Sequence, residues 1–198
     1  MFVSFEGVDG SGKSTQAELL AAFLAEQGRE VVATREPGGT PLGELIRGLV
    51  LDGPEMAPWA EAALFAAARA ELVERVIRPA LERGADVVCD RYVDSSLAYQ
   101  GIGRGLGVDE VLELNLTVVG GLLPDRTFVL VLEPDAAHAR LPETRDRIER
   151  EGAEFGTAVA AAYRRLAVLF PGRVRELDAT LPIDELAEQV RAEIAACV

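Results

Sequence analysis

Cysteine is scarce in this chain of 198 residues, which contains two, Cys89 and Cys197. Their number and spacing fit neither a metal site nor a disulfide framework, so we expect a protein of a reducing, cytoplasmic compartment. Apolar runs long enough to cross a bilayer are absent, as is a basic N-terminal region followed by an apolar core and a cleavage site. We therefore expect no membrane attachment.

Basic residues are also in short supply, because 20 Lys plus Arg against 33 Asp plus Glu give a net charge of -13. Such a field repels nucleic acid polymers and anionic membrane surfaces, so neither is expected as a partner. An anionic small ligand would have to be held by a local cluster of arginines. Hydrophobic residues make up 49% of the chain, enough to bury the core of a single domain over residues 1–198.

Lysine occurs only once, at Lys13, within the stretch Phe5-Glu6-Gly7-Val8-Asp9-Gly10-Ser11-Gly12-Lys13-Ser14-Thr15. This stretch matches the phosphate-binding P-loop, G-x-x-x-x-G-K-[ST], and lies between a short apolar run and a helical pattern. The alternative is a glycine-rich turn that matches the motif by chance. Such a turn would not need an apolar strand before it and a helix after it. Lys13 is expected to reach the β and γ phosphates of ATP, and Ser14 to offer its hydroxyl to Mg²⁺. The residues expected to bind ATP are Gly7, Val8, Asp9, Gly10, Ser11, Gly12, Lys13, Ser14 and Thr15.

Apolar strands alternate with helical patterns along the chain, which predicts an α/β fold of three layers with helices on both faces of a central parallel sheet. Strands are expected at 2–5, 31–33, 86–90, 126–133 and 174–177, and a long helix at 58–83, with Pro79 as a possible kink. A glycine-rich loop is expected at 101–107. Residues 135–152, charged and interrupted by Pro142, are expected to form a short mobile lid. Ligands of such a sheet bind at the carboxyl ends of its strands.

Three polar residues near predicted strand ends are candidates for chemistry. Asp90 closes the strand 86–90, where a P-loop enzyme needs a carboxylate to hold Mg²⁺ beside Ser14, although a helix or turn cap is an alternative. Arg91 follows at once and is suited to a second phosphate, unless it is an ordinary surface arginine. Asp9 would repel a triphosphate, so its side chain is expected to face a hydroxyl group of an acceptor.

Phe65 and Arg69 lie one turn apart on an apolar stripe of the long helix. An arginine in such a stripe needs partners, and one reading places Phe65 against a base with Arg69 donating to a base carbonyl. The other reading makes Phe65 plain core and lets Arg69 reach a neighbouring carboxylate. The residues alone leave both open.

The lid contains the remaining cationic cluster, Arg140, Arg145, Arg147 and Arg150. The variable positions of the P-loop carry no arginine, whereas phosphoryl transfer needs cationic stabilisation of the transferring group. A lid that closes would supply it and exclude water. A plain solvated pair between Asp146 and Arg150 is the alternative.

Taken together, these residues resemble the thymidylate kinases, nucleoside-monophosphate kinases of the P-loop class. The resemblance extends over nearly the whole chain. Beyond the P-loop it rests on Thr34-Arg35-Glu36-Pro37-Gly38-Gly39-Thr40, Leu64-Phe65-Ala66-Ala67-Ala68-Arg69, Asp90-Arg91-Tyr92, Ser95 to Gly101 and Asp146-Arg147-Ile148-Glu149. An arginine-bearing lid with no P-loop arginine is similar to the bacterial subgroup.

The resemblance implies transfer of the γ-phosphoryl group of ATP to dTMP with Mg²⁺ held at Ser14 and Asp90, in a cytoplasmic homodimer that serves dTTP synthesis. The catalytic residues it implies are Lys13, Arg91, Arg147 and Arg145. The residues implied to bind dTMP are Asp9, Glu36, Pro37, Arg47, Phe65, Arg69, Arg91, Ser96, Tyr99 and Gln100. Among these, Tyr99 is implied to press against the sugar where a ribose 2′-hydroxyl would stand.

Two other readings remain from the residues. A kinase for a different small acceptor, such as a deoxynucleoside or another nucleotide, would use much of the same machinery. A P-loop switch or partner-regulating ATPase would instead need a residue that orients water, and would have little use for Phe65, Arg69 or Asp9. Acceptor-independent ATP hydrolysis would favour that reading.

Overall fold

The structure, a computed structural model, describes residues 1–133, 136–137, 139–140 and 145–195. Within these residues, five parallel strands form one sheet in the order β2-β3-β1-β4-β5. The strands are β1 (Phe2–Glu6), β2 (Val31–Arg35), β3 (Asp86–Asp90), β4 (Arg126–Val131) and β5 (Val174–Asp178). The predicted parallel sheet is therefore confirmed, with each strand within two residues of its expected ends.

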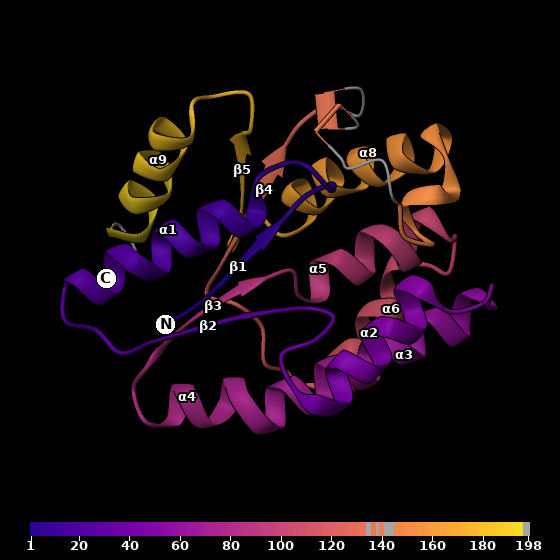
Figure 1. Ribbon diagram of the computed structural model, residues 1–198, viewed down its shortest axis with the longest axis horizontal. Helices are drawn as coiled ribbons and strands as arrows, with labels where there is room; N and C mark the ends of the chain where they lie inside the picture. The colour runs from indigo at the N-terminus through magenta and orange to yellow at the C-terminus, as the bar shows by residue number, and fades with distance from the viewer. Residues whose placement is uncertain (134–135, 138, 141–144, 196–198) are drawn as a thin grey trace.

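Helices cover both faces of this sheet (Figure 1). Helices α1 (Lys13–Glu26) and α9 (Ile183–Ala195) pack on one face. The other face carries α3 (Pro58–Leu72), η1 (Val73–Ile77), α4 (Arg78–Glu82), α5 (Val93–Ser96), η2 (Leu97–Gly103), α6 (Val108–Val118) and α8 (Ala153–Leu169). Helix α2 (Pro41–Asp52) lies against α3, and η3 (Glu149–Glu151) precedes α8.

Side chains of the central strands alternate between two cores because successive residues of a strand point to opposite faces. In β1, Phe2 belongs to the core under α3 to α8, whereas Val3 and Phe5 belong to the core under α1 and α9. In β4, Val129 and Phe128 divide in the same way. The wholly apolar strands of the sequence are thus explained by a sheet that is buried on both faces.

The predicted helix 58–83 exists as three joined segments. Helix α3 runs into the wide π-helical segment η1, and α4 then begins with Pro79 in its first turn. Proline has no N–H and its ring clashes with the carbonyl four residues earlier, here that of Arg75. The wider π-helical turn gives this carbonyl room, so the helical path continues where the sequence suggested a kink.

Two regions differ from the expectation. Residues 93–103 are helical, as α5 and η2, so the predicted loop at 101–107 begins after Gly103. Glycine at 101 and 103 is tolerated because α6 and α8 pack against η2, and tertiary packing outweighs helix propensity. The expected lid 135–152 includes residues 135, 138 and 141–144, which lie outside the described residues.

Candidate active site

Two adjoining hollows open at the carboxyl ends of β1, β2 and β3. The inner cavity has a volume of about 90 Å³ and the P-loop groove about 400 Å³. The inner cavity is lined by Asp9, Glu36, Pro37, Arg47, Leu51, Phe65, Arg91, Ser95, Ser96, Tyr99, Gln100, Asp146 and Ile148. The P-loop groove is lined by Asp9, Gly10, Gly12, Lys13, Ser14, Thr15, Arg35, Glu36, Arg47, Asp90, Arg91 and Arg140. Asp9, Glu36, Arg47 and Arg91 line both, so the hollows are continuous.

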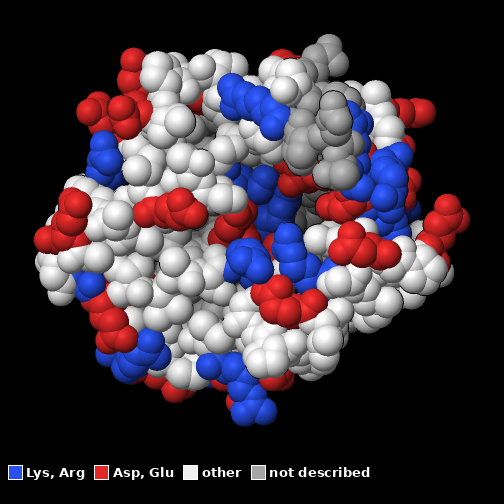
Figure 2. Space-filling model, viewed as in Figure 1, with Lys and Arg blue, Asp and Glu red and all other residues white. Residues whose placement is uncertain are grey.

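Basic side chains gather around a hollow in the face shown in Figure 2, although the chain as a whole carries a net charge of -13. The P-loop groove alone is lined by Lys13, Arg35, Arg47, Arg91 and Arg140. Walls of low dielectric concentrate such a local field, so the site attracts anions that the rest of the surface repels. This is the local arginine cluster that the composition required.

The P-loop turns sharply into helix α1. Gly12 caps the helix with φ 94°, a left-handed conformation that side chains with a Cβ rarely adopt. Lys13 is buried and donates from Nζ to the Val8 carbonyl, 2.8 Å away. Burial and the nearby charge of Arg91 lower the pKa of Lys13 to about 8. The free N–H groups of the helix start and the Lys13 ammonium therefore form a cradle for phosphate.

Ser14 and Asp90 meet at the edge of the P-loop groove. The Ser14 hydroxyl donates to Asp90 Oδ2 over 2.5 Å, and Asp90 Oδ1 is buried with no hydrogen-bond partner in the structure. Hard oxygen donors of this kind suit Mg²⁺, which keeps several waters and takes few protein ligands beside the phosphates of a nucleotide. Among the described residues no group of three or more His, Cys, Asp or Glu forms a metal cage. The pair therefore fits a magnesium ion that arrives with a nucleotide.

Arg91 lies at the junction of the two hollows with its backbone in a left-handed conformation, φ 70°. For a residue other than glycine this costs on the order of 1–3 kcal/mol. Its guanidinium contacts Asp9 Oδ1 at 2.5 Å and donates to Ser95 Oγ at 3.0 Å and to the Tyr163 hydroxyl at 3.1 Å. The strained backbone thus aims a fully positioned cation between the two hollows.

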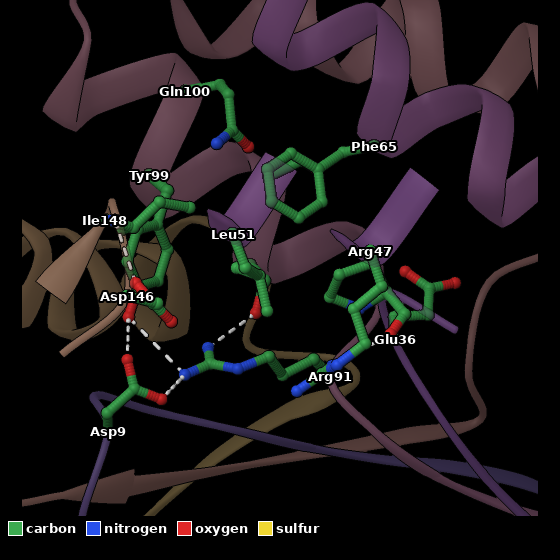
Figure 3. Close-up of a pocket in the computed structure, with 13 residues that line it drawn as sticks. Asp9, Glu36, Arg47, Leu51, Phe65, Arg91, Tyr99, Gln100, Asp146 and Ile148 are labelled. Atoms are coloured by element: carbon green, nitrogen blue, oxygen red, sulfur yellow. Dashed lines mark hydrogen bonds and ion pairs between the residues drawn. The ribbon is translucent and has the colours of Figure 1, made fainter. Parts of the chain in front are cut away.

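Asp9 faces Arg91 and Tyr99 (Figure 3), and its Oδ1 also lies 3.8 Å from Nζ of Lys13, so it stands where the P-loop groove meets the inner cavity. Although burial opposes ionisation, the charges of Arg91 and Lys13 lower the pKa of Asp9 to about 2. Its second oxygen, Oδ2, lies 3.4 Å from the Tyr99 hydroxyl. Asp9 is therefore an ionised acceptor that lines the inner cavity, and its predicted contact with a hydroxyl group of an acceptor stays a prediction.

A buried polar network that the sequence analysis missed supports Arg91 from below. Glu6 accepts from the Tyr92 N–H at 2.7 Å, from Ser95 Oγ at 2.6 Å and from the Tyr163 hydroxyl at 3.2 Å. Burial and the neighbouring Asp94 raise the pKa of Glu6 to about 7. The available signal was Tyr163, a hydroxyl-bearing residue among the apolar residues of a helix stripe.

The far wall of the inner cavity is apolar. Phe65 from α3 lies there, and Leu51 from α2, Ile148 and the Tyr99 ring supply further apolar lining of the cavity. In Figure 3, Phe65 and Gln100 lie on the side of the cavity opposite Asp9 and Arg91. A flat apolar slot with polar groups at its two ends fits a ring that stacks and also forms hydrogen bonds.

Arg69, predicted to meet a base, does not line the inner cavity and is only 1% exposed. It donates from Nε to Glu36 Oε2 at 2.7 Å, from Nη1 to Ser96 Oγ at 3.0 Å and to Asn115 Oδ1, and from Nη2 to the Tyr92 carbonyl at 3.0 Å. Nη2 also lies 2.6 Å from Glu36 Oε2. All five guanidinium N–H groups are thereby used. This geometry agrees with the reading in which Arg69 reaches a carboxylate. The direct contact of Arg69 with a base stays a prediction.

Glu36, Pro37 and Arg47 form the wall between the hollows. Arg47 donates from Nη1 to the Pro37 carbonyl over 2.9 Å. Burial raises the pKa of Glu36 to about 7 despite its pair with Arg69, and Glu36 Oε1 has no hydrogen-bond partner among the described residues. This oxygen is buried beside both hollows and is therefore available to a ligand that donates a hydrogen bond.

The lid arginines separate in space. Arg140 lines the P-loop groove, with Nη1 3.4 Å from the Gly10 carbonyl. Arg147, predicted to act on the phosphates, is 8% exposed and bonds away from them, to Glu61 Oε2 at 2.7 Å and to the Val50 carbonyl at 2.9 Å. Its position follows from the buried charge of Glu61, which needs a cation. Arg145 lines neither hollow.

A phosphate cradle that opens directly onto a second cationic site, with an apolar slot behind it, suits the transfer of a phosphoryl group between two ligands. Fold and site together therefore define a P-loop kinase. The structure also contains, among its described residues, no helix with the length and apolar character needed to span a membrane.

Comparison with known proteins narrows this class. The sequence model of the family described as "Thymidylate kinase" matches residues 5–190. Thymidylate kinase of Bifidobacterium longum (strain DJO10A) is 49% identical over 98% of this chain and 97% of its own length. That of Symbiobacterium thermophilum is 51% identical over 96% of this chain and 91% of its own length. The crystal structure of thymidylate kinase from Ehrlichia chaffeensis superposes with a TM-score of 0.79 at 32% identity, covering 98% of both chains. The chain belongs to the thymidylate kinase family.

Proposed function

We propose that this chain transfers the γ-phosphoryl group of ATP to dTMP, which yields ADP and dTDP, by in-line displacement. The observation that carries the proposal is the continuity of the two hollows, since Arg91 and Arg47 line both the P-loop groove and the inner cavity. A monophosphate held there would face the terminal phosphate of a nucleotide in the cradle. Positioning of this kind is the main contribution of an enzyme to phosphoryl transfer.

For the donor, we propose that residues Gly7 to Thr15 hold the phosphates of ATP, with Lys13 on the β and γ groups. For the acceptor, Arg91 and Arg47 would bind the phosphate and Asp9 would accept from the 3′-hydroxyl. Phe65 would stack on the base. The remaining residues proposed to contact dTMP are Glu36, Pro37, Ser96, Tyr99 and Gln100, all of which line the inner cavity.

Arg69 is proposed to serve the acceptor through the residues that it holds. Glu36 and Ser96 both line the inner cavity and both accept hydrogen bonds from Arg69. A direct bond from Arg69 to a thymine carbonyl would require one of these bonds to be exchanged, because no guanidinium N–H group is spare.

We propose that Ser14 and Asp90 hold Mg²⁺, which would neutralise charge that develops on the phosphates. Lys13 and Arg91 would stabilise the transferring group from the described part of the site. Of the lid arginines, Arg140 has the position closest to this role, and Arg145 remains a candidate. Arg147 is proposed to anchor the end of the lid instead.

We further propose a cytoplasmic homodimer. Helix α2 exposes Leu42, Leu45 and Leu49, with exposed fractions of 46%, 74% and 44%, and neighbouring α3 exposes Trp59 at 48%. Contiguous apolar residues on adjacent helices are typical of an interface between subunits. Sedimentation equilibrium that shows only a monomer at micromolar concentration would contradict this part of the proposal.

An assay of ADP release with Mg-ATP tests the function when it is run with no acceptor and then with dTMP, dUMP, dCMP, dGMP and thymidine. The account predicts strong release with dTMP, weaker release with dUMP and none with thymidine, which lacks the phosphate that Arg91 would hold. Release that is indifferent to the acceptor would point to an ATPase instead. A stronger response to another acceptor would identify a different kinase.

A further inference from the structure

Glu61, in the first turn of α3, is a buried carboxylate that does not line the inner cavity and yet is bonded to a residue that does. It is 1% exposed, and its Oε1 accepts from Nε2 of Gln100 over 2.9 Å and from Nε of Arg104 over 3.2 Å. Its Oε2 lies 3.0 Å from Nη2 of Arg104 and 2.7 Å from Nη1 of Arg147. Although burial opposes ionisation, these three partners lower the pKa of Glu61. The group is therefore ionised and can only accept hydrogen bonds.

This carboxylate determines which way the Gln100 amide faces. Gln100 is 2% exposed and lines the inner cavity, where Figure 3 shows its amide end among the cavity side chains. If the amide were reversed, its oxygen would face Glu61 Oε1, and two acceptors would meet without a proton between them. One N–H of the amide is consequently committed to Glu61, which fixes the NH₂ on that side and leaves the carbonyl oxygen as the acceptor that Gln100 can offer to a ligand.

We propose that Glu61 is a positioning residue for base selection, which acts by fixing Gln100 as a hydrogen-bond acceptor in the wall of the base site. This inference rests on the proposed function. The partner of such an acceptor is the ring N3–H of thymine or uracil. Cytosine has an unprotonated nitrogen at that position, so it would place one acceptor against another. A site with a fixed acceptor rejects the mismatched base because a buried polar group would lose its partner.

The same carboxylate is also bonded to a residue whose two neighbours in the chain line the cavity. Arg147, paired with Glu61, lies between Asp146 and Ile148, and these two residues line the cavity. Arg104 adds a link from Glu61 to Glu151, which it meets at 2.6 Å. The side chain that orients Gln100 thus also anchors residues 146–151 over the base site.

The test is Glu61→Gln, measured by calorimetric binding of dTMP and dCMP in the absence of ATP. In this variant Arg104 and Arg147 would both donate to the one oxygen of the new amide at position 61. The NH₂ group of that new amide would then face Gln100, and the Gln100 amide would have to reverse to accept from it. The preference for dTMP over dCMP is expected to fall about tenfold or more. Glu71→Gln, on the same helix and removing an exposed pair with Arg75, should leave the preference unchanged.

If the Glu61→Gln variant does not fold, Glu61→Asp provides a second test. The shorter carboxylate keeps its charge for the arginines but withdraws from Gln100, so a smaller loss of preference is expected. If a folded Glu61→Asp or Glu61→Gln variant keeps the full preference for dTMP over dCMP, the inference is wrong.

A measurement without ligand separates this inference from the proposed function. In ¹⁵N-labelled protein the Gln100 side-chain NH₂ should exchange slowly with solvent, and the Glu61 substitutions should shift it strongly, whichever nucleotide binds. An unshifted Gln100 NH₂ would overturn the inference even for an enzyme that phosphorylates dTMP. Failure of the wild-type protein to bind dTMP would instead overturn the proposed function.

Discussion

Arg91 combines a strained backbone with a guanidinium whose partners come from three different elements. Asp9 follows β1, Ser95 belongs to α5 and Tyr163 to α8. A left-handed arginine persists only where its surroundings determine it fully. The hydrogen bonds and the ion pair of the guanidinium hold this strained backbone in place, and Glu6 in turn accepts a hydrogen bond from Ser95. The result is a cation fixed between the two hollows.

Lys13 leads to a prediction about pH. Its folded pKa of about 8 is below the ordinary value of 10.5, so the free enzyme loses the ammonium charge as pH rises through 8. Because ATP needs the protonated form, kcat/KM for ATP should fall about tenfold per pH unit above this value. Initial rates at limiting ATP between pH 6.5 and 9.5 test this. A flat profile up to pH 9.5 would show that the charge of Lys13 is not lost in this range.

Arg69 leads to a prediction about stability. Its pair with Glu36 is buried, with side chains 1% and 4% exposed. Arg69→Met leaves the buried Glu36, Ser96 and Asn115 without their donor, so the free energy of unfolding should fall by about 3–5 kcal/mol.

Urea denaturation measures this, and Arg35→Met is the matched control. Arg35 pairs with Glu44 at the surface, with side chains 55% and 46% exposed, so its loss should cost less than about 1 kcal/mol. Equal effects of the two substitutions would contradict the structural role assigned to Arg69.

Among the elements, the two ends of the lid contact different parts of the site, Arg140 at one end and Arg147 at the other. Arg140, exposed beside Gly10, lies at the P-loop groove, whereas Arg147 is buried against Glu61. Arg140→Ala should therefore lower kcat, by about 10³ if it meets the transferring phosphoryl group. Arg147→Met should mainly raise the KM for dTMP, because Asp146 and Ile148 would lose their anchor.

Steady-state kinetics with each substrate varied in turn will distinguish the two arginines. The reverse pattern, with kcat lost in Arg147→Met and KM raised in Arg140→Ala, would exchange their roles.

The elements that the sequence predicted best are those defined by a repeating pattern or a fixed motif. The strands were predicted correctly because short apolar runs between helical patterns are seldom anything but buried strands. The P-loop was recognised because its glycines and its lysine each have a known part in binding phosphate. The helix at 93–103 was missed because its glycines indicate a loop. Only packing against α6 and α8 makes that stretch helical.

Side-chain partners were harder to predict than elements. The sequence left Phe65 open between a base contact and the plain core, and the structure has it among the residues that line the inner cavity. For Arg69 a neighbouring carboxylate was one of two readings, and Arg147 was expected at the phosphates; in the structure they pair with the buried carboxylates of Glu36 and Glu61. Each pairing joins residues far apart in the sequence, and no local pattern encodes it.

At the scale of the whole molecule, one sheet separates two cores that share the same strands. We predict that residues 1–198 form a single domain and unfold in one cooperative transition, with equal calorimetric and van't Hoff enthalpies. Two separate transitions in differential scanning calorimetry at low protein concentration would contradict a single domain.

The buried acids make the stability of the molecule depend on pH. Glu6 and Glu36 have ordinary pKa values of 4.5, which the fold raises to about 7. Between these values the folded state keeps protons that the unfolded state has lost, so stability falls as pH rises through this window. The loss is on the order of 3 kcal/mol for each group.

Chemical denaturation at pH 5, 6, 7 and 8 tests this, with the Glu6→Gln, Glu36→Gln double variant as the comparison. The variant should show a flatter dependence on pH. A wild-type protein that becomes more stable from pH 5 to pH 8 would contradict the assignment of these two groups.

In the proposed function, one continuous site holds both nucleotides, with the acceptor phosphate at Arg91. A crystal structure with dTMP and a non-hydrolysable ATP analogue tests it most directly. The account predicts the analogue's phosphates in the P-loop, the dTMP phosphate at Arg91 and Arg47, and the thymine ring against Phe65. A dTMP molecule bound outside the inner cavity, or with its phosphate away from Arg91, would contradict the account.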